Sequence, residues 1–165
     1  PPTSCMRPSG GVIRTSTGGS SSNGTPRASS APATANRFET LNGATIRTDA
    51  PKDIGGDATA FSPTDLVASG LASCILTTMA MYAERHGLDL SGSTATVEKH
   101  MTQPPFAPGQ GRRIARLPVV VTIPAKALAG APEDMRQRLE RAGHACPVHA
   151  SLHPDVDSPI EFRYV

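Results

Sequence analysis

The feature that most constrains the fold is a long apolar segment between Ser62 and Gly87. Ser62 is a favourable N-cap, Pro63 suits the first helical position, and Asp65 places a negative charge in the first turn, where the helix dipole favours it. Gly87 is a typical helix terminator. The segment therefore predicts one long helix. Because apolar or small residues occupy most of its faces, we expect other elements to surround it.

The same segment contains too many polar residues for the unbroken run of about 20 apolar residues that a membrane span needs. The interruptions are Ser69, Ser73, Thr77 and Thr78. The chain does not open on a basic stretch followed by a short apolar one, which a secretory signal peptide would show. Its three cysteines form no C-x-x-C pair and no disulfide framework. We therefore expect a soluble, cytoplasmic protein with no membrane partner.

Composition limits the other functions that the chain could have. The formal net charge of +2 is spread along 165 residues, without the clustered Lys and Arg of a nucleic-acid footprint. Aromatic residues make up 4% and Trp is absent, so base-stacking platforms are also missing. We expect no nucleic-acid partner and one folded domain, with a core of aliphatic residues and Met.

The first 36 residues differ in composition from the rest of the chain. Residues 1–36 are dominated by Ser, Thr, Gly, Pro and Ala, which bury too little apolar surface to order a chain. We interpret residues 1–36 as a flexible low-complexity tail and residues 37–165 as the folded domain. The domain is expected to open with a hairpin in 37–50, turning at Asn42-Gly43.

The remaining pattern predicts an α+β fold. Alternating apolar residues in 93–101 and 112–124 indicate an antiparallel strand pair, with Pro118 at an edge or a bulge. A second helix is expected from Pro132, and a last strand in 159–165. The stripe of that helix comprises Met135, Leu139, Ala142 and Cys146. The order of strands, helix, strands, helix and strand is that of an α+β protein.

Cys74 lies in the middle of the first expected helix, and two interpretations of it remain open. Its apolar neighbours would raise the thiol pKa by desolvation, and free Cys is among the most buried residue types, so an inert core cysteine is one interpretation. Small residues in the preceding turns, among them Gly70, would let another backbone approach closely. The second interpretation is therefore a reactive thiol beside a partner helix of this subunit or another.

Cys146 occurs in the sequence "HACPVH", where Pro147 ends the second helix or starts a new turn. Backbone N–H groups at such a junction can lower a thiol pKa, although a core residue at the end of the stripe is equally consistent with the pattern. Both cysteines lie on buried faces of the two helices, so they could meet. A zinc site competes with this interpretation, through His144, Cys146, His149 and His153, but Pro147 interrupts regular ligand spacing. We expect no metal and no cofactor.

Three segments carry a resemblance to a known family. They are the stretch "SPTDLVASGLASCILTTMAMYAERHGLDLSGSTATVEKH", the stretch "RRIARLPVVVTIP", and the C-terminal "LERAGHACPVHASLHPDVDSPIEFRYV". Together they resemble the OsmC/Ohr family, the osmotically inducible and organic hydroperoxide resistance proteins. The resemblance implies two central helices packed between antiparallel sheets, intertwined in a homodimer. It also implies a peroxiredoxin-like, thiol-dependent peroxidase of the oxidative stress response that reduces organic hydroperoxides and is restored by an external dithiol of the lipoyl type.

The resemblance also assigns roles to particular residues. Cys74 corresponds to the peroxidatic cysteine and Cys146 to the resolving cysteine. The family pairs an acid at the helix start with an arginine from the N-terminal strands. Here the acid's position is Thr64, so Asp65 is the candidate, together with Arg47 in preference to Arg37.

Two departures from the family pattern follow. Neighbouring helix positions point about 100° apart, so the displaced acid Asp65 need not reach the arginine. The family's first strand is also missing from the sequence pattern.

The alternative function is an OsmC-like binding or redox-sensing module without turnover.

Overall fold

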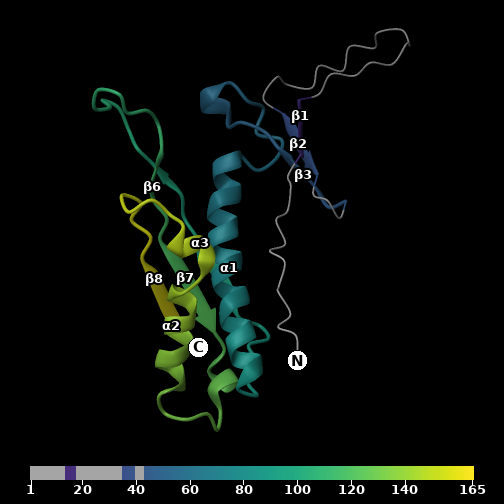
Figure 1. The fold of residues 1–165 in the computed structure, drawn as a ribbon, viewed down its shortest axis with the longest axis vertical. Coiled ribbons are helices and arrows are strands. Elements are labelled where there is room, and N and C mark those ends of the chain that lie inside the picture. The colour runs from purple at the N-terminus through teal and green to yellow at the C-terminus, as the bar shows by residue number, and fades with distance from the viewer. Residues whose placement is uncertain (1–13, 18–34, 40–42) are drawn as a thin grey trace, which may run out of the picture. The chain divides into compact units, whose positions relative to one another are not determined.

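The computed structural model describes residues 14–17, 35–39 and 43–165 (Figure 1). Contacts within the chain divide it into two compact units, Pro1–Pro63 and Thr64–Val165.

The first unit contains a three-stranded antiparallel sheet in the order β1-β2-β3. Its strands are β1 (Arg14–Thr17), β2 (Asn36–Glu39) and β3 (Thr45–Thr48). The pairing of β2 with β3, from Asn36 opposite Thr48 to Glu39 opposite Thr45, confirms the expected hairpin. Gly43, before β3, has φ +83°, a backbone conformation that glycine adopts without strain. Asn42 lies outside the described residues.

Strand β1 differs from the expected flexible tail of residues 1–36. Residues 14–17 pair with β2 along its whole length, from Arg14 opposite Glu39 to Thr17 opposite Asn36. The sheet therefore has a first strand that the sequence pattern did not show. Backbone hydrogen bonding does not require alternating apolar residues, and threonine favours extended backbone. The rest of the expected tail lies outside the described residues, apart from residues 35 and 36.

A buried carboxylate organises the loop that follows β3. Asp49 is fully buried and accepts hydrogen bonds from Ala50 N at 2.8 Å, from Thr59 N at 3.0 Å and from Thr59 Oγ1 at 2.9 Å. Its own N–H donates to the Phe61 carbonyl at 3.1 Å. Gly56 lies so close to this loop that an added Cβ would be 1.9 Å from the Ala50 carbonyl oxygen. The loop is thus held by specific bonds and by close backbone contact.

The second unit is built around α1 (Pro63–Arg85). The helix begins at the proline that the sequence indicated. At its other end Gly87, with φ +71°, donates to the Glu84 carbonyl at 3.1 Å, and Leu88 donates to the Ala83 carbonyl at 3.0 Å. These two bonds form a Schellman motif, which ends a helix at glycine. The predicted helix is confirmed at both ends.

The second unit contains two sheets. The first sheet has the order β4-β7-β8, with β4 (Thr94–Val97), β7 (Val119–Ile123) and β8 (Ile160–Tyr164). The second sheet pairs β5 (His100–Met101) with β6 (Ile114–Arg116). The antiparallel pairing of β4 with β7 confirms the expected pair, and Pro118 lies in the break between β6 and β7. Strand β8, however, runs parallel to β7, so the expectation of antiparallel sheets is wrong for this pair. A helical crossover joins the two strands, and such a connection returns the chain in the same direction.

The crossover consists of a 3-10 turn (Ala125–Leu128), α2 (Met135–His144) and α3 (Pro147–Ala150). Helix α2 lies against both α1 and β8, since a Cβ added at Gly143 would be 3.1 Å from Met79 Sδ and from Phe162 Cζ. Met135 and Leu139 are buried as expected, whereas Ala142 is half-buried. Gly143, and not Ala142, lies against Met79 of α1. The second unit is therefore an α+β arrangement with its core between α1, α2 and β7 (Figure 1).

By length and composition alone, α1 could cross a membrane, since one 18-residue window has a mean hydropathy of 1.6. One such helix is weak evidence, because the core helix of a globular protein passes the same test. In this structure Leu71, Ile75 and Met79 of α1 are fully buried within the core of the second unit. These buried residues account for part of the apolar composition of α1, since 33% of that window is buried and Val67 and Met81 are exposed.

Candidate active site

The two cysteines of the second unit lie in contact. Cys74 is half-buried in the middle of α1, and Cys146 is fully buried at the N-cap of α3, with Pro147 in the first turn. The two side chains influence each other: the Cys146 thiol lowers the pKa of Cys74, and Cys74 raises the pKa of Cys146. Both thiols are free. The crossover that makes β8 parallel to β7 is what returns the chain to α1 and brings Cys146 to Cys74.

The surroundings of Cys74 favour its thiolate. Burial raises its pKa and is the largest single influence, but three hydrogen-bond donors together lower the pKa below its ordinary value. The donors are the Cys146 thiol, the Val148 backbone N–H and the Thr78 hydroxyl. All three are uncharged. The pKa of Cys74 is therefore lowered by uncharged groups of the second unit, despite its burial.

The Thr78 hydroxyl makes the smallest of these contributions, for a geometric reason. It donates to the Cys74 carbonyl oxygen at 2.8 Å, the bond back to the preceding turn that Ser and Thr commonly make in helices. One hydroxyl proton cannot serve the carbonyl and the sulfur at the same time. Among the groups that lower the pKa of Cys74, the Cys146 thiol has the largest effect.

Cys146 has the opposite electrostatic character. Burial raises its pKa above the ordinary value, and its hydrogen bond to Cys74 raises it further, against the lowering effect of the His149 and Val148 N–H groups. The sequence placed Cys146 where backbone N–H groups lower a thiol pKa, and these groups are present. Burial and the neighbouring sulfur outweigh them, so of the two open interpretations the structure agrees with the buried core residue. The pair thus consists of one thiol whose pKa is lowered, Cys74, and one whose pKa is raised, Cys146.

Asp65 and Arg47 lie in different parts of the fold. Asp65, in the first turn of α1, forms an ion pair with Lys99, and Lys99 Nζ also donates to Thr64 Oγ1 at 3.0 Å. Lys99 follows β4 and is a partner that sequence reasoning missed, because the alternation through Ala95 and Val97 identified it only as a strand residue. Arg47 is an exposed residue of β3 in the first unit. The parts that Asp65 and Arg47 play at the thiol remain predictions.

A cavity of about 250 Å³ lies between α1 and the C-terminal end of α2, and neither Cys74 nor Cys146 is among its lining residues. Its lining is mostly apolar, and the residues are Thr78, Met81, Tyr82, Arg85, Ala142 and Ala145. Thr78 is one turn from Cys74, and Ala145 directly precedes Cys146. Sequence reasoning missed Tyr82, which faces this space from α1. The cavity thus offers apolar surface one residue or one turn away from the two cysteines along the chain.

The histidines near Cys146 do not assemble a metal site. Among the residues that the structure describes, no three His, Cys, Asp or Glu side chains lie close enough together to hold a metal ion. His149 instead bonds through Nε2 to the Ser158 carbonyl at 3.2 Å, and His144 lies edge-on to Phe162 with ring centroids 5.6 Å apart. These side chains serve the packing of α2 and α3.

Comparison with known proteins decides the family. The family model described as OsmC-like protein matches residues 55–161. The chain belongs to the OsmC family. The match includes both cysteines of the site and the whole of α1, so the resemblance noted in the sequence is confirmed.

Solved structures of the OsmC family share this fold. A crystal structure from Psychrobacter arcticus, provisionally described as an osmotic stress induced and detoxification response protein, is 32% identical and covers 78% of this chain and 88% of its own, with a TM-score of 0.67. The organic hydroperoxide resistance protein OsmC of Legionella pneumophila is 18% identical and covers 96% and 99%, with a TM-score of 0.67. OhrB of Bacillus subtilis is 18% identical and covers 93% and 98%, with a TM-score of 0.58. None of the curated proteins matches the chain significantly.

Proposed function

We propose that this OsmC-family protein is a thiol peroxidase that reduces organic hydroperoxides. The observation that carries the proposal is the contact between Cys74, whose pKa is lowered, and Cys146, whose pKa is raised. A peroxidatic cysteine needs an ionised sulfur, and a resolving cysteine needs to lie within reach of it. The names of the Legionella and Bacillus relatives, organic hydroperoxide resistance proteins, support the choice of substrate.

The proposed cycle uses the two sulfurs in sequence. The Cys74 thiolate attacks the terminal oxygen of the hydroperoxide, the O–O bond breaks, and the departing alkoxide takes up a proton to become an alcohol. Cys74 is then a sulfenic acid, and the sulfur of Cys146 attacks it, releasing water and forming a disulfide. An external dithiol of the lipoyl type reduces this disulfide by thiol–disulfide exchange and is itself oxidised to a disulfide. Cytoplasmic dithiol carriers would supply that step.

One experiment distinguishes this cycle from an inert cysteine pair. Reduced protein and its Cys146→Ser variant are each treated with one equivalent of cumene hydroperoxide, and the intact mass is measured. We expect the wild type to lose two hydrogens, since a disulfide forms. We expect the variant to gain one oxygen, since its sulfenic acid has no resolving thiol. No mass change in either protein would contradict the proposal.

The ion pair of Asp65 with Lys99 favours a second candidate function, an OsmC-like binding or redox-sensing module without turnover. Thr64 stands where peroxidases of the family have an acid, and Asp65 has a cation of its own in the second unit. A module of this kind would form the disulfide once, without being turned over by a dithiol. Repeated consumption of hydroperoxide in the presence of dihydrolipoamide would therefore exclude it.

We also propose that the protein is a homodimer, with one face of α1 covered by the partner subunit. A Cβ built at Gly70, in the middle of α1, meets no atom within 4 Å in the described chain. A cavity of about 500 Å³ lies on α1 between Ser69 and Thr77, with Ala95 and Val97 of β4 on its other side. Small residues on a helix face allow another backbone to approach closely, and the described chain supplies no such neighbour at Gly70.

Gly70→Leu is expected to weaken the dimer by roughly fivefold to 150-fold, since an interface loses about 1–3 kcal/mol when side chains are forced into its packed centre. Sedimentation equilibrium measures the dissociation constant. Gly111→Leu is the control, because it adds the same side chain in an exposed loop with nothing within 4 Å. An unchanged dissociation constant for Gly70→Leu would place the interface elsewhere.

A further inference from the structure

Two cavities between α1 and α2 have lining residues in common. The cavity of about 250 Å³ described above and a second one of about 460 Å³ are both lined by Tyr82, Ala142 and Ala145. The second cavity adds Arg138 and Arg141 of α2 to the lining. We call the two cavities together the α1–α2 groove.

The α1 side of this groove continues the helix face that carries Cys74. Thr78, Met81 and Arg85 line the groove, and they follow Cys74 at successive steps of four, three and four residues. Residues with this spacing share one face of a helix. Since an α-helix rises 1.5 Å per residue, Arg85 lies about 16 Å along the axis from Cys74. One face of α1 therefore carries the thiol near its middle and a cation near its end.

The α2 side of the groove has the same order of groups. Helix α2 runs back along α1 in the opposite direction (Figure 1). Its lining residues begin with Arg138 and Arg141 and continue through Ala142 and Ala145, and the next residue in the chain is Cys146. The groove therefore leads from an arginine end toward the two cysteines.

The surface between these ends suits an apolar chain. Met81 is 51% exposed although it is a large apolar side chain. The half-buried ring of Tyr82 stacks on His86 with centroids 4.2 Å apart, which holds the ring beside the groove. Ala142 and Ala145 have short side chains and leave room opposite. Apolar surface with a few polar groups at defined places is typical of small-molecule sites.

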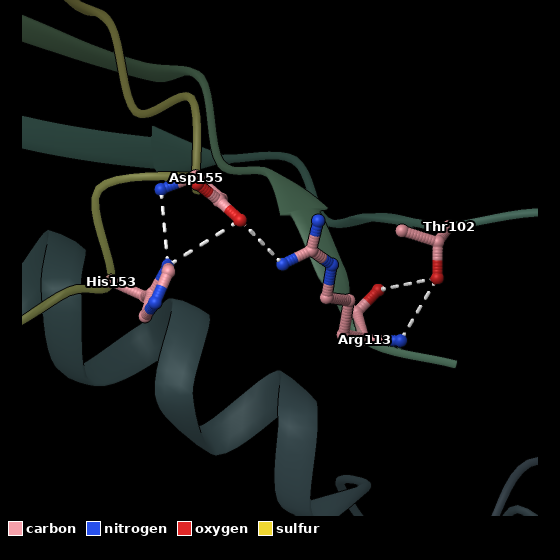
Figure 2. Close-up of polar contacts among 4 residues, drawn as sticks. All are labelled: Thr102, Arg113, His153 and Asp155. Carbon is pink, nitrogen blue, oxygen red and sulfur yellow. Dashed lines mark hydrogen bonds and ion pairs between the residues drawn. The ribbon is translucent and has the colours of Figure 1, made fainter. Parts of the chain in front are cut away.

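The arginine end presents cations that the described chain does not neutralise. Several arginines of the second unit have acidic partners, and Figure 2 shows one of them, Arg113, with its guanidinium 2.8 Å from the Asp155 carboxylate. Arg138 is likewise paired, with Asp134. Arg85 and Arg141 are exposed, and neither side chain forms an ion pair with any residue that the structure describes. Two guanidinium groups at one end of an apolar groove are complementary to an apolar chain that ends in an anion.

We propose that Arg85 and Arg141 are specificity-determining residues, which bind an anionic group at the far end of the substrate and so select long-chain hydroperoxides that carry a carboxylate. The inference rests on the proposed function and names the substrate class of the same site. The hydrocarbon chain lies along Met81 and Tyr82, and the peroxide group is directed toward Cys74. Because the two arginines are remote from the reacting sulfur, they contribute to binding and not to cleavage of the O–O bond.

The test compares linoleic acid hydroperoxide with its methyl ester, which has the same chain and peroxide group but no charge. Turnover is measured with the full-length reduced protein and dihydrolipoamide. We expect the double variant Arg85→Gln, Arg141→Gln to raise KM for the acid roughly fivefold to 30-fold with kcat unchanged, since each exposed cation contributes modestly to binding. KM for the methyl ester should match the wild type.

Arg136→Gln is the matched control. It removes a cation from the same helix, but Arg136 lies over the Tyr164 ring, 4.2 Å from its centroid, and does not line the groove. Both substrates should keep their wild-type KM in this variant.

Two results would overturn the inference. An unchanged KM for the acid in the double variant would show that the arginines do not bind the carboxylate. Equal rises for acid and ester would show that the substitutions disturb the groove and that charge is not recognised.

Failure of the proposed function would be seen separately, as wild-type protein that consumes neither cumene hydroperoxide nor the longer substrates. Binding of linoleate, which has no peroxide group, tests the arginines in that case as well. We expect the double variant to weaken linoleate binding by the same factor in titration calorimetry, and an unchanged dissociation constant would contradict the assignment of Arg85 and Arg141.

Discussion

Replacing Cys74 by serine is expected to lower the rate of hydroperoxide reduction by roughly 1000-fold or more, which is the scale of removing a catalytic nucleophile. A serine hydroxyl stays protonated at neutral pH, so the three donors around position 74 would have no anion to stabilise. The measurement is the steady-state consumption of cumene hydroperoxide with dihydrolipoamide as the reductant. Circular dichroism should show an unchanged helix content, since the two side chains have similar shapes.

The matched control for this variant is Cys5→Ser, which removes the third cysteine of the chain and is expected to leave turnover unchanged. Turnover retained in Cys74→Ser would show that another group reduces the peroxide. Turnover lost in both variants would show that the tail cysteine takes part, and the assignment of Cys146 as the resolving thiol would fail.

Gly56→Ala is expected to destabilise the protein by about 2–3 kcal/mol, the upper part of the range for overpacking. A methyl group at this position would lie 1.9 Å from the carbonyl oxygen of Ala50, and backbone cannot rotate away as a flexible side chain can. The loop would have to open, and Asp49 would lose its bonds to Thr59. A carboxylate left buried without these donors is unfavourable, which adds to the cost. Urea denaturation followed by circular dichroism measures the free energy of unfolding.

Gly111→Ala is the control for the loop variant, because a Cβ at Gly111 meets nothing within 4 Å. Its free energy of unfolding should stay within about 0.5 kcal/mol of the wild type, as is usual for exposed positions. Equal stability of Gly56→Ala and the wild type would mean that the close contact between Gly56 and Ala50 does not exist in solution.

The long helix was the element best predicted from sequence, because its ends are encoded locally. Pro63 and Gly87 act through the φ angles and hydrogen bonds of their own residues, so no distant contact is needed to place them. The β2–β3 hairpin and the β4–β7 pair were likewise predicted from local alternation and turn residues.

The existence of strand β1 and the direction of strand β8 could not be predicted from local sequence patterns. The direction of β8 is set by the crossover through α2 and α3, a property of the path of the chain that alternation along one strand cannot reveal. Strand β1, Arg14–Thr17, carries no apolar residue at all, and only its pairing with β2 defines it. Both features depend on pairing with another strand, and neither pairing can be recognised from the residues of the strand itself.

For the site, the sequence identified the two cysteines and the turn at Pro147, but not the balance of influences on each thiol. The raised pKa of Cys146 follows from burial and from the neighbouring sulfur, which are properties of the assembled core. The pairing of Asp65 with Lys99 joins residues 34 positions apart. Such contacts depend on tertiary structure, so the residue types alone could not predict them.

Because the crossover brings Cys146 to Cys74, the proposed disulfide would also change the stability of the folded chain. The two residues are 72 positions apart, so an S–S bond between them would enclose β4 to β7 and all of α2 in a covalent loop. Because the bond lowers the conformational entropy of the unfolded chain, it raises the free energy of unfolding by about 4 kcal/mol. Each catalytic cycle would therefore alternate between a tethered chain and an untethered one. The protein would be most resistant to unfolding just after it has met an oxidant, and most vulnerable when it is ready to meet the next.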